Sequence, residues 1–254
     1  MINVVGVAVG TKYPPEIYVE NLWLGLNKHL SKPFFLTILT DNPDHAYYHS
    51  RPINTVRIPQ WPEVEHNPRR YWWYKMFLFN PQFPVTGDVL YLDMDTCIVG
   101  SMDKFFEYTN KFCICQDFNR KWIPQYGVCN SSVMRWNTDT HAYIWEQFDQ
   151  QRSEHIKKFK GDQDFVTDTI RDKEYTWWPK EWAMSFKWEV YRGGLINSGT
   201  GLDNSGQWPA DANMYHVPDQ PWVLYDSTSV VVFHGKPEPA ETQFFKQHSL
   251  VPNL

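Results

Sequence analysis

Short apolar runs alternate with amphipathic segments along the first hundred residues of this 254-residue chain. Four runs have the length and composition of buried strands, at residues 4–9, 34–39, 56–58 and 89–92. Between them, residues 16–30 carry apolar side chains at helical spacing, and a second predicted helix at 70–79 ends before two prolines. Alternating strands and helices are typical of an α/β fold whose largely parallel sheet is covered on both faces.

The pattern changes after residue 95. Apolar runs predict strands at 112–116, 128–136 and 230–233, and helical spacing predicts helices at 141–159 and 165–170. Residues 177–208 are rich in Trp, Gly, Asn and Ser without clear periodicity, so we predict mostly loop there. We find no internal repeat, low-complexity segment or linker. The chain is therefore predicted to form a single Rossmann-like α/β domain over 1–254, with a mostly parallel central sheet and a loop-rich second half.

The composition excludes several classes of protein. A hydrophobic fraction of 42% with 21% charged residues is typical of a folded domain and argues against disorder. The net charge of −5 gives no global basic field that would recruit nucleic acid. Aromatic residues make up 17% of the chain, including 13 Trp, and such rings either stack on sugars or bases or fill the core. We assign most of them to the core.

The sequence does not predict a membrane or secreted protein. No run reaches the roughly 18 apolar residues that cross a bilayer, so no transmembrane segment is expected. The amino terminus has the pattern of a first strand rather than of a signal peptide. The four cysteines form no Cys-x-x-Cys pair, so a zinc cluster is not expected and a reducing, cytoplasmic compartment is the simplest interpretation.

Two aspartates separated by one residue, Asp93 and Asp95, follow directly after the apolar run 89–92. At the carboxyl end of a strand in an open α/β sheet, they would lie where ligands bind. The two carboxylates repel each other strongly unless a cation neutralises them, and hard oxygen ligands suit Mg²⁺ or Mn²⁺. The alternative is a pair of turn or N-cap aspartates that hold no metal.

A second polar segment follows the late apolar run 230–233 and consists of His234, Gly235, Lys236 and a proline. A neutral imidazole is a metal ligand, glycine permits close backbone approach, and lysine supplies positive charge for a diphosphate. Taken alone, the segment is typical of an ordinary turn with an exposed lysine. Taken together with the two aspartates, it predicts two strand ends that converge on one cation.

Two further polar segments are candidates for contact with a sugar. Asp162 and Gln163 begin a predicted helix, where a carboxylate and an amide could contact sugar hydroxyls or the anomeric centre, although Asp162 could equally be a helix N-cap. Asn130, Ser131 and Ser132 interrupt an apolar segment, so they either hydrogen-bond a polar substrate or form a turn or bulge.

The order of these segments resembles the glycogenin-like, family 8 glycosyltransferases over most of the chain. These enzymes have the GT-A fold, use nucleotide-sugar donors and retain the anomeric configuration. The segment 91–96 is similar to their Asp-x-Asp signature, 130–134 to a sugar-binding Asn-Ser-Gly-Val segment, 162–163 to an Asp-Gln pair, and 234–237 to a late metal and phosphate segment. The resemblance implies a GT-A fold with a nucleotide-binding half at 1–100 and an acceptor half at 101–254.

The resemblance also implies roles for individual residues. The residues implied to bind the donor are Val7, Val9, Gly10, Tyr13, Lys75, Asp93, Met94, Asp95, Asn130, Ser131, Gly235 and Lys236. Mn²⁺ or Mg²⁺ would be held by Asp93, Asp95 and His234, and catalysis would involve Asp162, Gln163 and Lys236. The implied donor is a UDP-sugar, and the acceptor is a glycan, lipid or protein. The chain departs from the family pattern at Ser132, where glycine is usual, at Phe159, where glycogenin has an acid, and in the closer His-Gly-Lys spacing.

Two other classes of protein fit part of the sequence. A haloacid dehalogenase-type phosphohydrolase would use Asp93 as its nucleophile, but that nucleophile normally follows the first strand, and Asp93 follows several elements. A non-catalytic carbohydrate-binding module would account for the Trp residues between 177 and 188, but it needs no clustered metal and phosphate groups at several strand ends. We therefore predict a metal-dependent glycosyltransferase.

Overall fold

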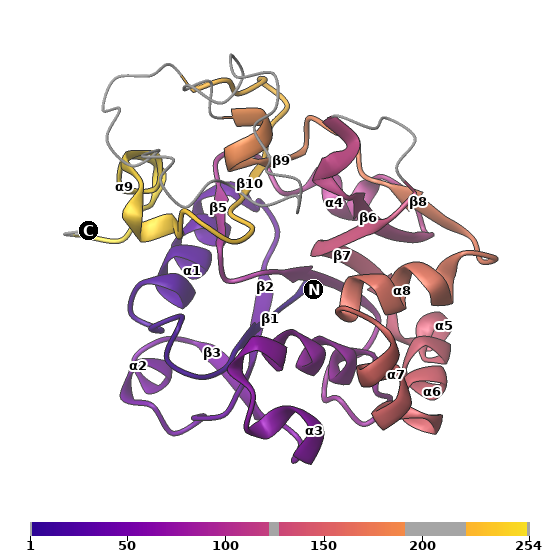
Figure 1. Ribbon diagram of the computed structural model, residues 1–254. Helices are drawn as coiled ribbons and strands as arrows, with labels where there is room; N and C mark the ends of the chain where they lie inside the picture. Colours follow the sequence, from indigo (N-terminus) through magenta and orange to yellow (C-terminus); the bar gives the residue numbers. More distant parts are fainter. Residues whose placement is uncertain (1, 122–126, 191–221, 253–254) are drawn as a thin grey trace.

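A seven-stranded sheet forms the centre of the computed structural model, which describes residues 2–121, 127–190 and 222–252 (Figure 1). The strands lie in the order β3-β2-β1-β4-β7-β6-β8. Their bounds are β1 (Ile2–Ala8), β2 (Phe34–Thr40), β3 (Ile53–Arg57), β4 (Asp88–Leu92), β6 (Phe112–Gln116), β7 (Cys129–Asn137) and β8 (Tyr175–Trp177). Only β7 runs antiparallel to its neighbours, β4 and β6, and the other pairs are parallel. The predicted α/β class with a mostly parallel central sheet is confirmed.

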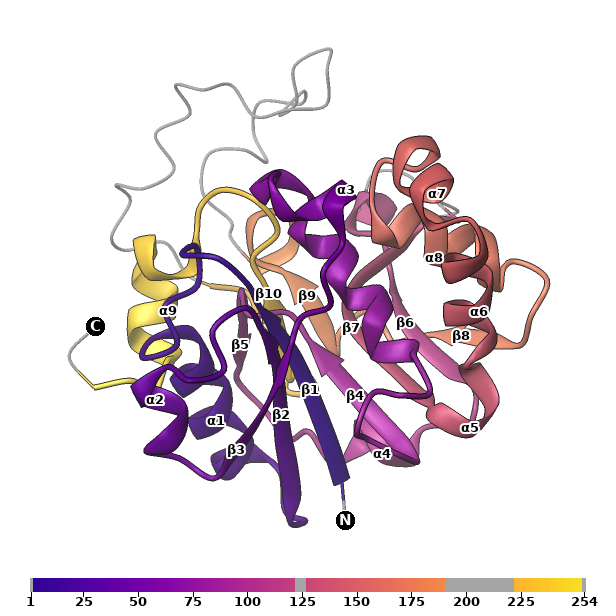
Figure 2. The ribbon, with the colours of Figure 1, turned by 90° about the horizontal axis from the view of Figure 1, so that it is seen from below.

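Helices cover both faces of this sheet (Figure 2). One face is covered by α1 (Tyr18–His29), α2 (Ala46–His49) and α4 (Lys104–Glu107). The other face is covered by α3 (Pro62–Glu65), the 3₁₀ helix η1 (Pro68–Phe79), α5 (Thr138–His141), α6 (Tyr143–Gln150), α7 (Arg152–Lys158) and α8 (Asp162–Ile170). Because successive side chains of a strand point to opposite faces, Val4 and Ala8 of β1 pack on the α1 side, while Val5 and Val9 pack on the η1 side.

A second, three-stranded sheet extends the molecule beyond the carboxyl end of β4. It consists of β5 (Thr96–Ile98), β10 (Val230–Val232) and β9 (Ala183–Ser185), with β10 in the middle. β10 is antiparallel to β5 and parallel to β9. The amide of Phe233 donates to the carbonyl of Asp95 over 2.8 Å, so the segment after β10 starts beside the acid pair. The remaining short elements are η2 (Phe118–Lys121), the π-helix η3 (Phe186–Val190), η5 (Pro239–Glu241) and α9 (Gln243–His248).

Several predicted elements differ from those observed. The predicted continuous helix at 141–159 is divided in the structure among the end of α5, α6 and α7. The break between α6 and α7 occurs because the backbone of Gln151 leaves the helical conformation (φ −139°, ψ 40°). The prediction of mostly loop at 177–208 is wrong for 183–190, where β9 and η3 form, and residues 191–208 lie outside the described part of the chain. β9 has only three residues and is held by pairing with β10, so no periodicity in the sequence could reveal it.

The structure also describes the state of the cysteines and the character of the helices. All four cysteines are buried and free. Within the described ranges, none of the helices combines the length and the apolar character that a membrane span requires.

Candidate active site

The acid pair lies at the carboxyl end of β4, as the sequence predicts. The Asp93 carboxylate accepts hydrogen bonds from the Lys75 ammonium, at 2.9 and 3.2 Å, and from the Tyr91 hydroxyl. Its backbone is also fixed, because its amide donates to the Ser132 carbonyl at 2.9 Å and its carbonyl accepts from the Thr96 hydroxyl at 2.8 Å. Asp93 therefore has a single orientation that is set by four elements of the fold.

Lys75 joins three polar side chains from different elements. It projects from η1, is only 7% exposed, and lies 3.1 Å from the Ser131 hydroxyl and 3.5 Å from the Asp162 carboxylate. Burial disfavours the ammonium form, but the charges of Asp162 and Asp93 outweigh burial and raise the pKa of Lys75. Burial in turn raises the pKa of Asp162, against the opposing effects of Lys75 and Ser131. The Ser131 hydroxyl donates to Asp162 over 2.5 Å.

A bulge in β7 places Ser131 in this network. The pairing of β6 with β7 passes from Ile114–Met134 directly to Cys115–Asn130, so the residues between Asn130 and Met134 have no partner on β6. The Asn130 side chain accepts from the Ser132 amide at 3.0 Å and stabilises this bulge. Of the alternatives that the sequence left open for 130–132, the bulge is observed, and it turns Ser131 toward Lys75 and Asp162, whereas contact with a polar substrate stays a prediction.

Asp95 has a different environment from Asp93. Its carboxylate accepts from the Tyr13 hydroxyl at 2.9 Å, and that hydroxyl lies 2.7 Å from the Lys12 ammonium, which also forms an ion pair with Glu238 at 3.2 Å. Burial and the neighbouring charge of Asp93 raise the pKa of Asp95 to about 7. The charges of Lys12 and Lys75 lower the pKa of Asp95 but do not outweigh burial and the repulsion from Asp93, which a bound cation would relieve.

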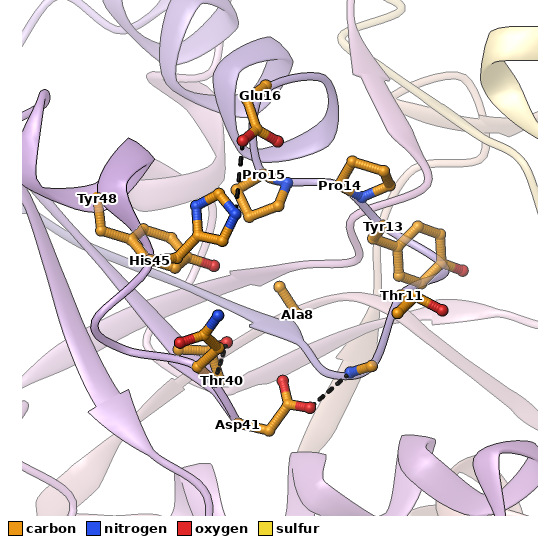
Figure 3. Close-up of a pocket in the computed structure, with 12 residues that line it drawn as sticks. Ala8, Thr11, Tyr13, Pro14, Pro15, Glu16, Thr40, Asp41, His45 and Tyr48 are labelled. Atoms are coloured by element: carbon orange, nitrogen blue, oxygen red, sulfur yellow. Dashed lines mark hydrogen bonds and ion pairs between the residues drawn. The ribbon is translucent and has the colours of Figure 1, made fainter.

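A pocket of about 250 Å³ opens beside Tyr13, at the carboxyl ends of β1 and β2 (Figure 3). Its lining residues are Ala8, Gly10, Thr11, Tyr13, Pro14, Pro15, Glu16, Thr40, Asp41, Asn42, His45 and Tyr48. At its floor, Asp41 accepts from the Gly10 amide at 3.1 Å, and Gly10 has a positive φ of 74° that favours glycine. Tyr13 connects the two features, because its ring lines the pocket and its hydroxyl binds Asp95.

Three of the predicted donor-site residues, Val7, Val9 and Met94, pack their side chains against the core instead of lining this pocket. Val7 and Val9 pack against the apolar core on the η1 side of the sheet. Met94 is buried in the core on the α1 side, where its methyl group fills the space that a Cβ on Gly6 would need. Their side chains therefore serve packing in this structure, whereas the predicted residues Gly10 and Tyr13 do line the pocket.

The late segment lies near the acid pair, but its side chains point elsewhere. The His234 ring stacks on Phe118 at 5.0 Å, and its Nε2 lies 2.7 Å from the Ser185 hydroxyl. Burial, with a smaller contribution from the Lys187 charge, holds the pKa of His234 well below its usual range. Lys236 is exposed and bonded to Glu241 at 2.8 Å.

The three predicted metal ligands, Asp93, Asp95 and His234, do not form a closed set of metal ligands in the structure. In the parts of the chain that the structure describes, no group of three or more His, Cys, Asp or Glu side chains is arranged to hold a metal. The two carboxylates of Asp93 and Asp95 suit a divalent cation in charge and donor type, whereas the His234 imidazole bonds to Ser185 and does not complete the set. The pair fits a cation that takes its remaining ligands from water or substrate.

Two charged residues of this region were missed by the sequence reasoning. Lys187, on η3, interacts electrostatically with Asp95 and His234, and burial lowers its pKa to about 8. Arg120 is buried and forms a bidentate pair with Glu189, with both N–O distances 3.0 Å. No sequence signal marks either one, because both depend on the pairing of β9 with β10.

The predicted residue Gln163 hydrogen-bonds through its side chain to Asp117, close to the start of α8.

Solved structures of glycosyltransferases resemble this chain in fold. GlyE of Streptococcus pneumoniae TIGR4 superposes with a TM-score of 0.61 at 14% identity, over 94% of this chain and 56% of the GlyE chain. The galactosyltransferase LgtC, in complex with donor and acceptor sugar analogues, gives 0.56 at 13% identity, over 94% of this chain and 89% of LgtC. The bifunctional glycosyltransferase WbbM gives 0.58 at 11% identity, over 97% of this chain and 48% of WbbM.

These similarities establish the class of fold. The chain has the GT-A glycosyltransferase fold, so this prediction is confirmed. It spans about half the length of GlyE and WbbM. No protein-family model and no curated protein matches the sequence. The structural similarities give no support to the haloacid dehalogenase alternative.

Proposed function

We propose that this protein is a glycosyltransferase that moves a sugar from a nucleotide-diphosphate sugar, with a UDP-sugar as the first candidate. The observation that carries the proposal is the network of Lys75, Asp93, Ser131 and Asp162, which is buried on a GT-A fold beside Asp95 and a pocket. A buried charge network at the carboxyl edge of an α/β sheet is where such folds bind and transform ligands. In this proposal, residues 1–100 hold the nucleotide and residues 101–254 hold the acceptor.

The pocket at the ends of β1 and β2 is proposed to hold the nucleoside. Its volume of about 250 Å³ and its mixture of aromatic and polar walls suit a base and ribose. Tyr13 then leads from the nucleoside to Asp95, so a diphosphate attached to that nucleoside would reach the acid pair. The donor sugar, bound to the second phosphate, would lie toward Asp162 and Ser131.

A divalent cation, Mn²⁺ or Mg²⁺, is proposed to bind at Asp93 and Asp95, and such an ion stabilises negative charge on a departing diphosphate. Lys75 holds Asp93 in place through its contact of 2.9 Å. The Tyr13 hydroxyl fixes the other carboxylate from the pocket side. Both aspartates are therefore oriented before any ligand binds, which is the preorganisation that electrostatic catalysis requires.

Asp162 and Gln163 are proposed to act at the anomeric carbon, with Asn130 and Ser131 beside them. The bond from C1 to the diphosphate oxygen breaks with its electrons on that oxygen, and the acceptor hydroxyl attacks C1 from the same face. The hydroxyl proton passes to the departing oxygen, and the configuration at C1 is retained because the new bond forms on the face that the diphosphate leaves. Asp162 is held by Lys75 and Ser131, which suits electrostatic support of an oxocarbenium-like transition state better than nucleophilic attack.

The proposal is tested by thermal unfolding with a panel of nucleotide-sugars, each with and without Mn²⁺. A ligand present at about a hundredfold its dissociation constant adds roughly 2.7 kcal/mol of stability. We expect one nucleotide-sugar, first a UDP-sugar, to raise the melting temperature, and Mn²⁺ to increase that shift. No shift with any nucleotide-sugar would contradict the proposal.

Substitution of the acid pair gives an independent test. Asp95→Asn should abolish sugar transfer without lowering the melting temperature of the free protein, because the amide has the same shape and relieves the repulsion from Asp93 but cannot balance a cation. Asp172→Asn, at an exposed turn, is the matched control and should be fully active. Full activity of Asp95→Asn would remove the central premise.

A further inference from the structure

Lys187 is a second lysine whose charge acts on the acid pair, through Asp95. It is half-buried on the π-helix η3, which lies beside β9 in the second sheet (Figure 1). Its charge interacts with those of Asp95 and Glu238. Its ammonium lies 3.4 Å from the position that a Cβ on Gly235 would occupy. The ammonium therefore lies next to the late segment, within electrostatic range of Asp95 and Glu238.

Carboxylates already pair with the other lysines of this region. Lys75 is bound to Asp93 and Asp162, Lys12 to Glu238, and Lys236 to Glu241. Lys187, by contrast, has no hydrogen bond or close ion pair with any residue in the described ranges, and its ammonium lies 5.3 Å from the centre of the Trp188 ring. A partly desolvated ammonium without a close counter-ion is stabilised by an incoming anion, and so it is the group best placed to bind one.

The backbone that carries Lys187 is fixed on both sides. Glu189 receives the bidentate pair from Arg120, and its carboxylate also accepts from the Ser185 amide at 2.9 Å. The Trp188 amide donates to the Ser185 hydroxyl at 3.1 Å. These contacts tie Trp188 and Glu189 of η3 to β9 and η2, and Lys187 directly precedes them, so its backbone position is built into the fold.

Gly235 leaves the approach to Lys187 open. Its φ of 75° lies in the left-handed region, and a side chain there would begin 3.4 Å from the Lys187 ammonium. A glycine at this position keeps the space beside the ammonium free for a ligand. The late segment thus contributes backbone and open space, while its own lysine is turned to the surface.

We propose that Lys187 binds the diphosphate of the nucleotide donor, in the role that the sequence suggested for Lys236. The inference rests on the proposed function, since it requires a nucleoside diphosphate at the acid pair. The ammonium would contact a phosphate oxygen and balance the charge that accumulates when the C1–O bond breaks. It would act whether or not a divalent cation is bound at Asp93 and Asp95.

The test compares diphosphate and nucleoside binding by calorimetry. The ligands are the nucleoside diphosphate among UDP, GDP, ADP and CDP that binds the unmodified protein most tightly, and its parent nucleoside. Lys187→Met should weaken binding of the diphosphate by about 10- to 100-fold, because a charge-assisted hydrogen bond is lost, and leave nucleoside binding unchanged. Lys187→Arg should restore most of the affinity. Lys246→Met, on the exposed surface of α9, is the control and should bind both ligands normally.

The outcomes separate this inference from the proposed function. If the unmodified protein binds no nucleoside diphosphate, both are overturned. If it binds one and Lys187→Met binds it equally well, only the role of Lys187 is overturned, and a loss in Lys236→Met would then return that role to Lys236. Equal losses for diphosphate and nucleoside in Lys187→Met would also overturn the inference, because they would show a general effect on the pocket. Melting temperatures of all variants establish that each is folded.

Discussion

Replacement of Lys75 by methionine tests the buried network at its centre. Methionine has nearly the length of lysine but no charge, so the change removes the positive charge and leaves the space largely filled. The Asp93 and Asp162 carboxylates, at 2.9 and 3.5 Å from the ammonium, would then face each other without their counter-ion. Removing one partner of a buried ion pair costs about 3–5 kcal/mol.

That cost has a measurable size and a defined dependence on pH. For a chain of this length, about 3–5 kcal/mol lowers the melting temperature by roughly 6–20 °C. Burial raises the pKa of Asp162 and Lys75 lowers it, so in Lys75→Met the folded-state pKa of Asp162 rises further. An acid whose folded-state pKa is raised destabilises the protein above that pKa, and the penalty falls as the pH drops toward the unfolded-state value. The deficit of Lys75→Met should therefore shrink between pH 7.5 and pH 5.

Urea denaturation followed by tryptophan fluorescence at both pH values gives the two free energies of unfolding. The double variant Lys75→Met/Asp162→Asn is the control, because it removes one of the two stranded charges. It should be more stable at pH 7.5 than Lys75→Met alone, with a coupling energy of about 1–3 kcal/mol. A loss below about 1 kcal/mol in Lys75→Met, or the same loss at both pH values, would refute the assignment of a buried, charged network.

Two further substitutions test the second sheet and its junctions. Arg120→Met should lower the free energy of unfolding by about 3–5 kcal/mol, because it strands the Glu189 carboxylate, and a urea midpoint equal to that of the unmodified protein would contradict this. Gly100→Ala should cost about 1–3 kcal/mol in a thermal melt, since the new Cβ would lie 2.3 Å from the Thr228 carbonyl oxygen, which is backbone and cannot swing away. Gly127→Ala meets no atom of the described residues within 4 Å and should change stability by less than about 0.5 kcal/mol. An equal loss in both alanine variants would disprove the steric argument.

The sequence predicted those parts of the fold that depend on local pattern. The apolar run at 89–92 is buried on both faces and forms a strand for that reason, and the same holds for most of the run at 4–9 and for residues 36–39 of the next run. Elements whose stability comes from distant partners were missed. β9 and η3 together span eight residues. β9 is held by pairing with β10, and η3 is held by the contact between Arg120 and Glu189. Neither interaction leaves a periodic signal in the sequence.

The sequence predicted the site in the same uneven way. Lys75, Asp93, Ser131 and Asp162 were each candidates, but their mutual contacts could not be foreseen, since they depend on where η1 and α8 dock on the sheet. For His234, the sequence predicted the position in the fold but not the direction of the side chain. Its place after a strand beside the acid pair is as expected, yet the side chain turns to Ser185, which lies on the unpredicted β9.

The direction of β7 explains why polar residues at the start of a strand reach the active site. In a parallel sheet only the residues that follow a strand lie at its carboxyl edge, and the sequence argument for Asp93 used that rule. β7 runs antiparallel to β4, with Val133 opposite Leu92 and Asn137 opposite Asp88. The first residues of β7 therefore lie at the same edge as the residues after β4, and the Ser132 carbonyl receives the Asp93 amide. One reversed strand thus brings a hydroxyl to a site otherwise built from strand and helix termini, and the bulge turns it toward Lys75 and Asp162.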